Sequence, residues 1–96
     1  MPRVKVRAFA DLREILGFSV LEAEIQSATV RDLIVFLSSK HNRRFRPLLI
    51  DRKTGHLKKF YKILVNGRDI DFLDGLETRL KEGDELAFFS PVGGGV

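Results

Sequence analysis

The chain has 96 residues, of which 44% are hydrophobic and 9% aromatic, and this composition predicts one folded domain spanning 1–96. It contains no cysteine, which excludes disulfides, thiolate metal sites and a cysteine nucleophile. No apolar run approaches the roughly 20 residues of a membrane helix, and the N-terminus lacks the apolar core of a signal peptide. We therefore expect a cytoplasmic protein with no membrane partner, while the formal net charge of +4 permits an acidic protein or a nucleic acid as partner.

The first quarter of the chain predicts two neighbouring strands. Residues 4–9 alternate between apolar and polar side chains, which is typical of a strand with one buried face. Asp11 is a candidate cap for a short helix over 12–16 that ends at Gly17, and 18–25 form a second extended stretch. Because the link between the two stretches is short, we expect them to pair as antiparallel strands.

One long helix is predicted next. The sequence Thr29-Val30-Arg31-Asp32 is typical of a capping box that opens a helix. This helix should end near 39–41 and cover one face of a sheet. Its apolar face consists of Val30, Leu33, Ile34 and Leu37.

The middle of the chain is less regular. A polar, basic segment at 42–46 precedes a short apolar run at 48–50, and 51–55 form a candidate turn. Leu57 and then 60–65 predict another strand, which leads into the next turn.

The last third predicts a hairpin and a final strand. Asn66-Gly67 is the favoured two-residue hairpin turn. Residues 72–80 form a connection anchored by Leu76 and Leu80, and 85–90 form the last strand. Together the elements predict an α+β fold, a mixed sheet of four to five strands with one long helix on one face. The first and last strands should lie side by side and parallel in the middle of the sheet, and the other sheet face should stay open.

No residue pattern indicates a catalytic or metal site. No nucleophile–base pair is visible, and two histidines, His41 and His56, without a cysteine do not form a convincing metal site. Asp69 and Asp71 are interpreted as turn residues at the exit of the hairpin.

Two basic stretches, 40–46 and 58–62, interleave cations with aromatic side chains, as a binder of single-stranded nucleic acid would. Such stretches also form solvated loops and protected strand edges. A specific nucleic-acid motif is missing. We therefore favour a solvated surface or an acidic protein partner over a nucleic acid.

The open sheet face is a candidate partner surface. If Leu86 and Phe88 point toward the helix, strand alternation places Phe89 on the opposite face. The result would be an apolar patch with a cationic fringe at the root of the C-terminal tail. A register error of one residue would bury these aromatics instead. The candidates for this open face are Lys5, Arg7, Phe9, Phe60, Lys62, Leu64 and Phe89.

The C-terminal tail is the most unusual segment. The last strand runs into Pro91, three glycines follow at 93–95, and Val96 comes last. Because glycine has no Cβ, such a tail can enter a channel too narrow for side chains, which suits chemistry on a reachable C-terminal carboxylate. The alternative is a frayed end or an expression remnant. We expect 92–96 to be flexible in the free protein.

Four motifs occur in an order that resembles a known family: FADLREILG, ATVRDL, ILVNGRDI and LKEGDELAFFSPVGGG. They resemble the sulfur carriers among the ubiquitin-like proteins. The small subunit of molybdopterin synthase (MoaD-like) is the closest match, and the thiamine sulfur carrier (ThiS-like) is more distant. The resemblance covers nearly the whole chain, and the segment 42–59 is longer than in compact members.

The resemblance implies a ubiquitin-like β-grasp fold and a sulfur-carrier function in molybdenum or tungsten cofactor synthesis. An adenylyltransferase of the ubiquitin-E1 type would attach AMP from ATP to the C-terminal glycine, and a persulfide would displace AMP to leave a thiocarboxylate. The large synthase subunit would then receive the tail and transfer the sulfur to a pterin precursor. The carrier itself would bind no cofactor or metal, and its partner subunit would supply the catalytic groups.

The resemblance also assigns roles to individual residues. The paired glycines of the family fall on Gly94 and Gly95, with Gly95 as the adenylate and thiocarboxylate site, and Gly93 takes a variable position. Val96 departs from the pattern, because members end at the second glycine, so either Val96 is removed first or the chain is not a sulfur carrier. Two alternatives stay open: a protein modifier conjugated to lysines, and a ubiquitin-like binding module with an inactive tail. The other tail residues of this alignment are Pro91, Val92 and Gly93. From the open sheet face we expect Phe89, with Arg7, Phe9 and Leu64, to contact the activating enzyme and the large synthase subunit.

Overall fold

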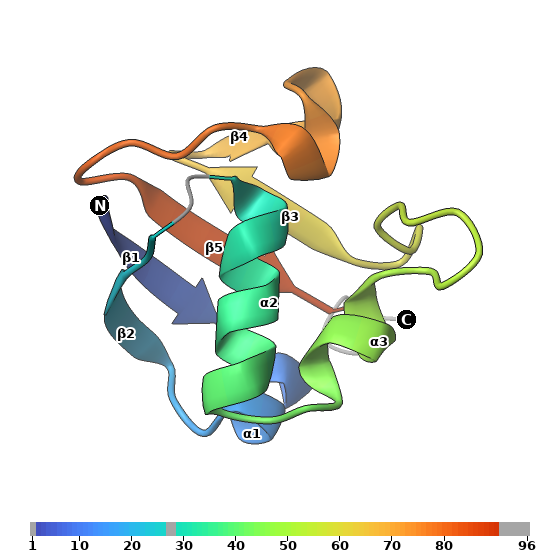
Figure 1. Ribbon diagram of the computed structural model, residues 1–96. Helices are drawn as coiled ribbons and strands as arrows, with labels where there is room; N and C mark the ends of the chain where they lie inside the picture. Colours follow the sequence, from blue (N-terminus) through green and yellow to red (C-terminus); the bar gives the residue numbers. More distant parts are fainter. Residues whose placement is uncertain (1, 27–28, 91–96) are drawn as a thin grey trace.

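The computed structural model describes residues 2–26 and 29–90. Within these residues a five-stranded sheet carries helix α2 across one face (Figure 1). No described helix is long and apolar enough to cross a membrane. The elements are β1 (Arg3–Ala8), α1 (Asp11–Leu16), β2 (Val20–Glu24), α2 (Val30–Lys40), α3 (Phe45–Leu49), β3 (Lys62–Val65), β4 (Arg68–Asp69), the 3-10 turns η1 (Ile70–Phe72) and η2 (Gly75–Glu77), and β5 (Glu85–Phe89).

The strand order is β2-β1-β5-β3-β4. β1 pairs antiparallel with β2 and parallel with β5, and β3 pairs antiparallel with both β5 and β4. The first and last strands therefore lie side by side in the centre, as predicted from the sequence. Because one helix layer covers one sheet face, the architecture is the expected α+β arrangement with an open second face.

Helix α2 begins and packs as its sequence predicts. The Thr29 hydroxyl accepts a hydrogen bond from the Asp32 backbone N–H (3.1 Å), and Asp32 Oδ2 accepts one from the Thr29 N–H (3.3 Å). This capping box satisfies backbone donors that a helix start leaves without an intrahelical partner. The apolar face of the helix is fully buried against the sheet and consists of Val30, Leu33, Ile34 and Leu37.

Strand alternation builds the other side of the core. Leu86 and Phe88 of β5 are fully buried beneath the helices, while Phe89 is half-buried on the opposite face. Buried and more exposed side chains alternate in the same way along β1 and β3. The prediction of which residues point to each face of the sheet is therefore confirmed. The turn between β3 and β4 is also confirmed, because Asn66 (φ 52°) and Gly67 (φ 84°) adopt the positive φ angles of a type I′ hairpin.

Two local predictions were wrong. Asp11 does not cap α1, because it is the first helical residue and Ala10 (φ 55°) precedes it without a side-chain capping bond. The basic segment at 42–46 is no simple loop, since α3 begins within it at Phe45, whose side chain is completely buried against Phe88. The ring centroids of Phe45 and Phe88 lie 5.6 Å apart, so α3 forms part of the core.

Candidate partner-binding face

The sheet face opposite α2 carries most of the residues predicted for a partner surface. In the pairing register, Arg7 of β1 lies opposite Ala87 of β5, and Ala87 lies opposite Leu64 of β3. Because paired residues point to the same side of a sheet, these three side chains form one row across the open face. Leu64 is half-buried within this row. Lys62 lies opposite Phe89 in the next row, toward the tail.

Phe9 and Phe89 form the apolar centre of the face. Their ring centroids lie 4.6 Å apart, and the ring planes are almost parallel at 4°. The Phe9 backbone N–H donates to the Phe88 carbonyl (3.2 Å), which extends the β1–β5 pairing one residue beyond β1 and sets the two rings side by side. Phe9 remains 40% exposed. The stack therefore presents a rigid apolar surface one residue before Ser90 and the start of the tail.

Two cations of the predicted fringe, Arg7 and Lys62, form ion pairs with acids of the domain. Arg7 Nε lies 2.6 Å from Glu85 Oε2. Lys62 Nζ lies 3.2 Å from Asp69 Oδ2 and 3.5 Å from Asp71 Oδ2. The sheet register brings these partners together, and they leave the face apolar at its centre and mixed in charge at its edges.

The ion pairs shift the titration of their members. The hydrogen bond from Arg7 is the main cause that lowers the pKa of Glu85; burial opposes it, and the charges of Arg7 and Lys5 add smaller lowering effects. The Asp71 backbone N–H lowers the pKa of Asp69, and the hydrogen bond to Asp69 raises the pKa of Lys62. All three groups are therefore charged at neutral pH.

Sequence reasoning missed Phe72, which is 87% exposed and is the most exposed of the large hydrophobic side chains in the described residues. It lies in η1 and lines a shallow hollow of about 450 Å³ with Leu64 and Leu73. The hollow extends the apolar surface away from the Phe9–Phe89 stack. The available indication was an isolated phenylalanine at the start of the connection 72–80, and it was interpreted only as part of that connection. Phe60 was predicted for the open face as part of a strand, but it precedes β3 and is 73% exposed.

The remaining polar candidates have local roles or contacts. Asp69 accepts a hydrogen bond from the Asp71 backbone N–H (2.9 Å), which is the predicted turn chemistry. The ring of His41 packs edge-on against Phe18. Within residues 2–26 and 29–90, no group of three histidine, cysteine, aspartate or glutamate side chains could hold a metal ion. The tail residues Pro91, Val92, Gly93, Gly94, Gly95 and Val96 lie outside the described residues.

The sequence matches the ThiS family model over residues 6–95. The chain belongs to the ThiS family. A relative in Archaeoglobus fulgidus, named as a candidate sulfur carrier protein, is 34% identical over 92 residues, which cover 96% of this chain and 98% of that protein. Small archaeal modifier protein 3 of Haloferax volcanii is 33% identical over 93 residues, with the same two coverages. This ThiS-family chain is thus similar both to a named sulfur carrier and to a named modifier.

Several solved structures are also similar to this chain. Small archaeal modifier protein 1 of Methanosarcina acetivorans superimposes with a TM-score of 0.80 at 34% identity, covering 99% of this chain and 98% of that one. A candidate molybdopterin converting factor subunit 1 of Pyrococcus furiosus gives 0.75 at 30% identity, covering 95% and 99%. A chain of the BexX/CysO complex of Amycolatopsis orientalis gives 0.74 at 30% identity, covering 91% and 93%. The ubiquitin-like β-grasp fold implied by the resemblance is therefore confirmed for this member of the ThiS family.

Proposed function

We propose that this ThiS-family protein is a sulfur carrier whose C-terminal glycine, Gly95, becomes a thiocarboxylate that donates sulfur to the pterin precursor of molybdenum or tungsten cofactor. The observation that carries the proposal is the Phe9–Phe89 stack, an exposed apolar surface placed directly before the glycine tail. A partner that docks on this stack holds the domain with the tail beside its own active site.

The geometry of the tail root supports this role. β5 is paired on both sides, by β1 and by β3, so Phe89 sits at the end of a fully hydrogen-bonded central strand. The five residues 91–95 extend at most about 17 Å from that fixed point. A rigid root and a short tail without large side chains would deliver the terminal carboxylate into a narrow channel.

In this chemistry the carrier supplies only its C-terminal carboxylate. An E1-type adenylyltransferase joins the carboxylate to AMP and releases pyrophosphate from ATP. A persulfide on a sulfur donor then displaces AMP to form an acyl disulfide, and a second thiol cleaves its S–S bond, which leaves the thiocarboxylate on the chain and a disulfide on the donor. Because the sulfur is carried on the chain terminus, no cysteine is needed, in agreement with the composition. Removal of Val96 precedes activation, since Gly95 must be terminal to be adenylated. We place these steps in the cytoplasm.

Two relatives support the choice of partners. The Pyrococcus furiosus protein is named as a molybdopterin converting factor subunit, and the Amycolatopsis orientalis chain was solved in a BexX/CysO complex. We extend this to the present chain by proposing two partners, an E1-type adenylyltransferase and the large subunit of molybdopterin synthase. Phe89, Phe9, Leu64 and Arg7 form the contact surface for both partners.

A second function, conjugation to lysines of target proteins, is favoured by a specific observation. Two similar proteins, from Haloferax volcanii and Methanosarcina acetivorans, are named as small archaeal modifiers. Both functions use the same activated carboxylate and differ only in the nucleophile that attacks it, sulfur in one case and a lysine amine in the other.

The intact mass of the protein purified from its own cells tests the first function. We expect loss of Val96 and the mass increase of one oxygen exchanged for sulfur. The same lysate, blotted for the chain, tests the second function, since conjugates appear as larger species that survive denaturation. A chain that keeps Val96, carries no sulfur, forms no conjugates and is not adenylated by the cognate enzyme with ATP would be a binding module with an inactive tail, which overturns both functions.

A further inference from the structure

The basic charge of the chain is concentrated in one segment. Residues 40–59 contain eight of the 17 Lys and Arg residues but only one of the 13 acidic residues, Asp51. The net charge of this segment is +7, so the remainder of the chain carries −3. The segment includes α3 and the loop after it, which lie beside α2 on the helix-covered side of the sheet (Figure 1). The proposed sulfur-carrier function uses the opposite side of the sheet and leaves this charge unexplained.

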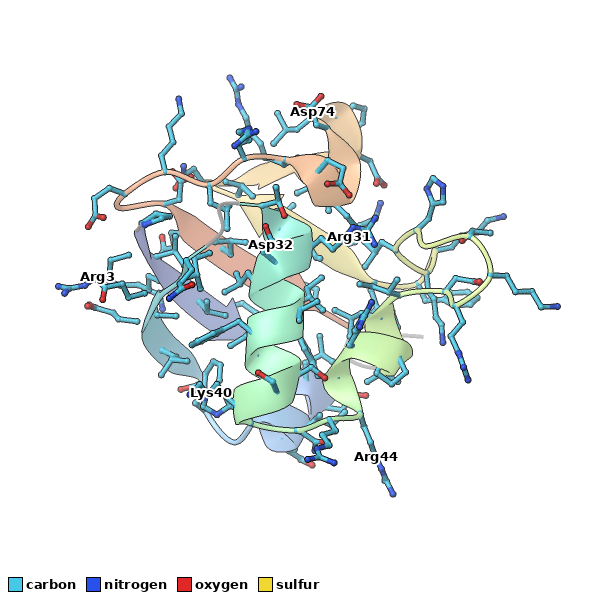
Figure 2. The ribbon with its side chains drawn as sticks, viewed as in Figure 1. Arg3, Arg31, Asp32, Lys40, Arg44 and Asp74 are labelled. Carbon is cyan, nitrogen blue, oxygen red and sulfur yellow. The ribbon has the colours of Figure 1, made fainter. Side chains whose placement is uncertain are left out.

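A groove of about 700 Å³ runs between α2, α3 and the loop at 51–55. Its apolar part is formed by Val35, which is 39% exposed, together with Pro47 and Ile50. Figure 2 shows Arg31 on the side of α2 that faces α3 and this loop. Four arginines also line the groove, and they are Arg31, Arg43, Arg46 and Arg52.

The walls of the groove are fixed by hydrogen bonds. The Ser38 hydroxyl, buried between α2 and α3, donates to the Arg43 carbonyl (3.0 Å) and accepts from the Arg46 backbone N–H (3.1 Å). On the other wall, Asp51 Oδ1 accepts from the backbone N–H groups of Lys53 (2.8 Å) and Thr54 (3.2 Å). The arginines therefore extend from a preorganised backbone, which lowers the entropy lost when a ligand binds.

Most of the border charge has no internal partner. Among the described residues, the structure gives one ion pair at the groove, from Arg31 Nε to Glu77 Oε2 (2.7 Å), and none to Arg43, Arg46 or Arg52. The single acid in the groove, Asp51, accepts backbone hydrogen bonds that lower its pKa and keep it ionised without engaging an arginine. A ligand with several carboxylates would complement this border.

The lining distinguishes between two classes of polyanion. Single-stranded nucleic acids gain affinity by stacking bases on aromatic side chains, and none of the described residues that line the groove is aromatic. Its apolar part is aliphatic, from a valine, a proline and an isoleucine. These features fit an aliphatic side chain flanked by carboxylates better than they fit a base.

We propose that the groove between α2 and α3 binds an acidic peptide segment of a partner protein. One aliphatic side chain of the segment packs on Val35, Pro47 and Ile50. Its neighbouring carboxylates pair with Arg43, Arg46 and Arg52. Because the groove and the Phe9–Phe89 stack lie on opposite sides of the sheet, both surfaces can be occupied at once.

The test is a titration of the ¹⁵N-labelled full chain with a synthetic peptide in which one leucine is flanked on both sides by glutamate and aspartate. We expect amide shifts at Val35, Ser39 and Arg46 and none at Phe9 or Leu64. The variant R43E/R46E should lose on the order of tenfold or more in affinity. The matched control R13E/R79E makes the same change in net charge at exposed arginines outside the groove, and its affinity should fall much less.

Three further measurements with the same titration test the proposal. V35S and a peptide with serine in place of leucine should each weaken binding, because both remove the aliphatic contact while keeping every charge. Phe89→Ala should leave the peptide affinity unchanged. Equal losses in R43E/R46E and R13E/R79E would mean that only net charge matters, and tighter binding of oligothymidylate than of the peptide would mean a nucleic-acid surface. Either result, or self-association of the free chain through the same amides, overturns the proposal.

Discussion

The Phe9–Phe89 face and the groove beside α2 differ in how their charges are compensated. On the sheet face, Arg7 pairs with Glu85 and Lys62 pairs with Asp69, so the apolar Phe9–Phe89 centre is flanked by two ion pairs. In the groove, three of four arginines have no ion pair within the described part of the chain. The first surface suits a partner recognised by apolar contact, whereas the second suits a partner recognised by charge.

This difference has a consequence for salt dependence. Exposed charges interact over about 8 Å at physiological ionic strength and are screened at higher salt, whereas burial of apolar area is not weakened by added salt. Binding to the sheet face should therefore tolerate high salt, and binding to the groove should not.

Gly94→Val should abolish activation by the cognate adenylyltransferase while the domain stays folded and the groove keeps its affinity for the acidic peptide. A valine side chain at this position would not enter a channel shaped for glycine. The measurement is ATP–pyrophosphate exchange with the purified enzyme. Deletion of Val96 is the matched variant and should support equal or faster exchange. Efficient adenylation of Val96 itself would contradict the glycine-terminus account.

Phe45→Ala should destabilise both surfaces at once, because Phe45 of α3 is fully buried against Phe88 of the central strand. Removal of a buried phenylalanine costs about 3–5 kcal/mol of unfolding free energy, a large part of the roughly 5–15 kcal/mol typical of a domain. Urea unfolding measures this loss. Phe60→Ala is the control, since Phe60 is 73% exposed and should cost less than about 0.5 kcal/mol. Similar losses in both variants would show that α3 is not part of the core.

Phe89→Ala should weaken binding to the adenylyltransferase by about tenfold, or about 1.4 kcal/mol, because it removes half of the exposed aromatic stack. The domain should stay folded, with a stability loss near 1 kcal/mol from the lost ring contact. Calorimetry at low and high salt gives the affinity, which should change little with salt in the wild type. If the variant unfolds and its folded fraction binds normally, Phe89 serves the core and not the partner.

The pH dependence of the Arg7–Glu85 pair should be the smallest effect, because both side chains are more than 40% exposed. The pKa of Glu85 is lowered in the folded state, mainly by the hydrogen bond from Arg7. The pair therefore contributes stability above the ordinary glutamate pKa and loses it as the pH falls through the lowered value. The difference in melting temperature between wild type and Glu85→Gln should shrink on acidification. A difference that is independent of pH would mean that the pair adds no stability.

Local sequence patterns were enough to predict much of the fold. The capping box at Thr29 and the Asn66-Gly67 turn depend on neighbours within four residues, and both formed as expected. The opposite burial of Phe88 and Phe89 follows from the two-residue period of a strand. These features predicted the open face and placed Phe9 and Phe89 on it, but they did not predict Phe72. The residues of the tail chemistry lie beyond Ser90, outside the described residues.

Features that depend on distant pairing could not be predicted in the same way. Arg7 and Glu85 are 78 residues apart in the chain, so their ion pair exists only because β1 and β5 meet in one register. Helix α3 was missed because the polar, basic segment at 42–46 was interpreted as a solvated surface. Pro47 is the third helical residue, where its missing N–H costs no intrahelical bond, and Phe45 is held by contact with a distant strand.

The central position of β5 also bears on how the protein matures during synthesis. β5 is translated after every other strand, yet β1 and β3 are joined only through it. Until β5 emerges from the ribosome, the nascent chain can form only the separate β1–β2 and β3–β4 hairpins, and such small hairpins are marginally stable alone. The chain therefore completes its fold with the same strand that presents Phe89. Any enzyme that recognises the β5 surface thereby selects chains whose sheet is complete.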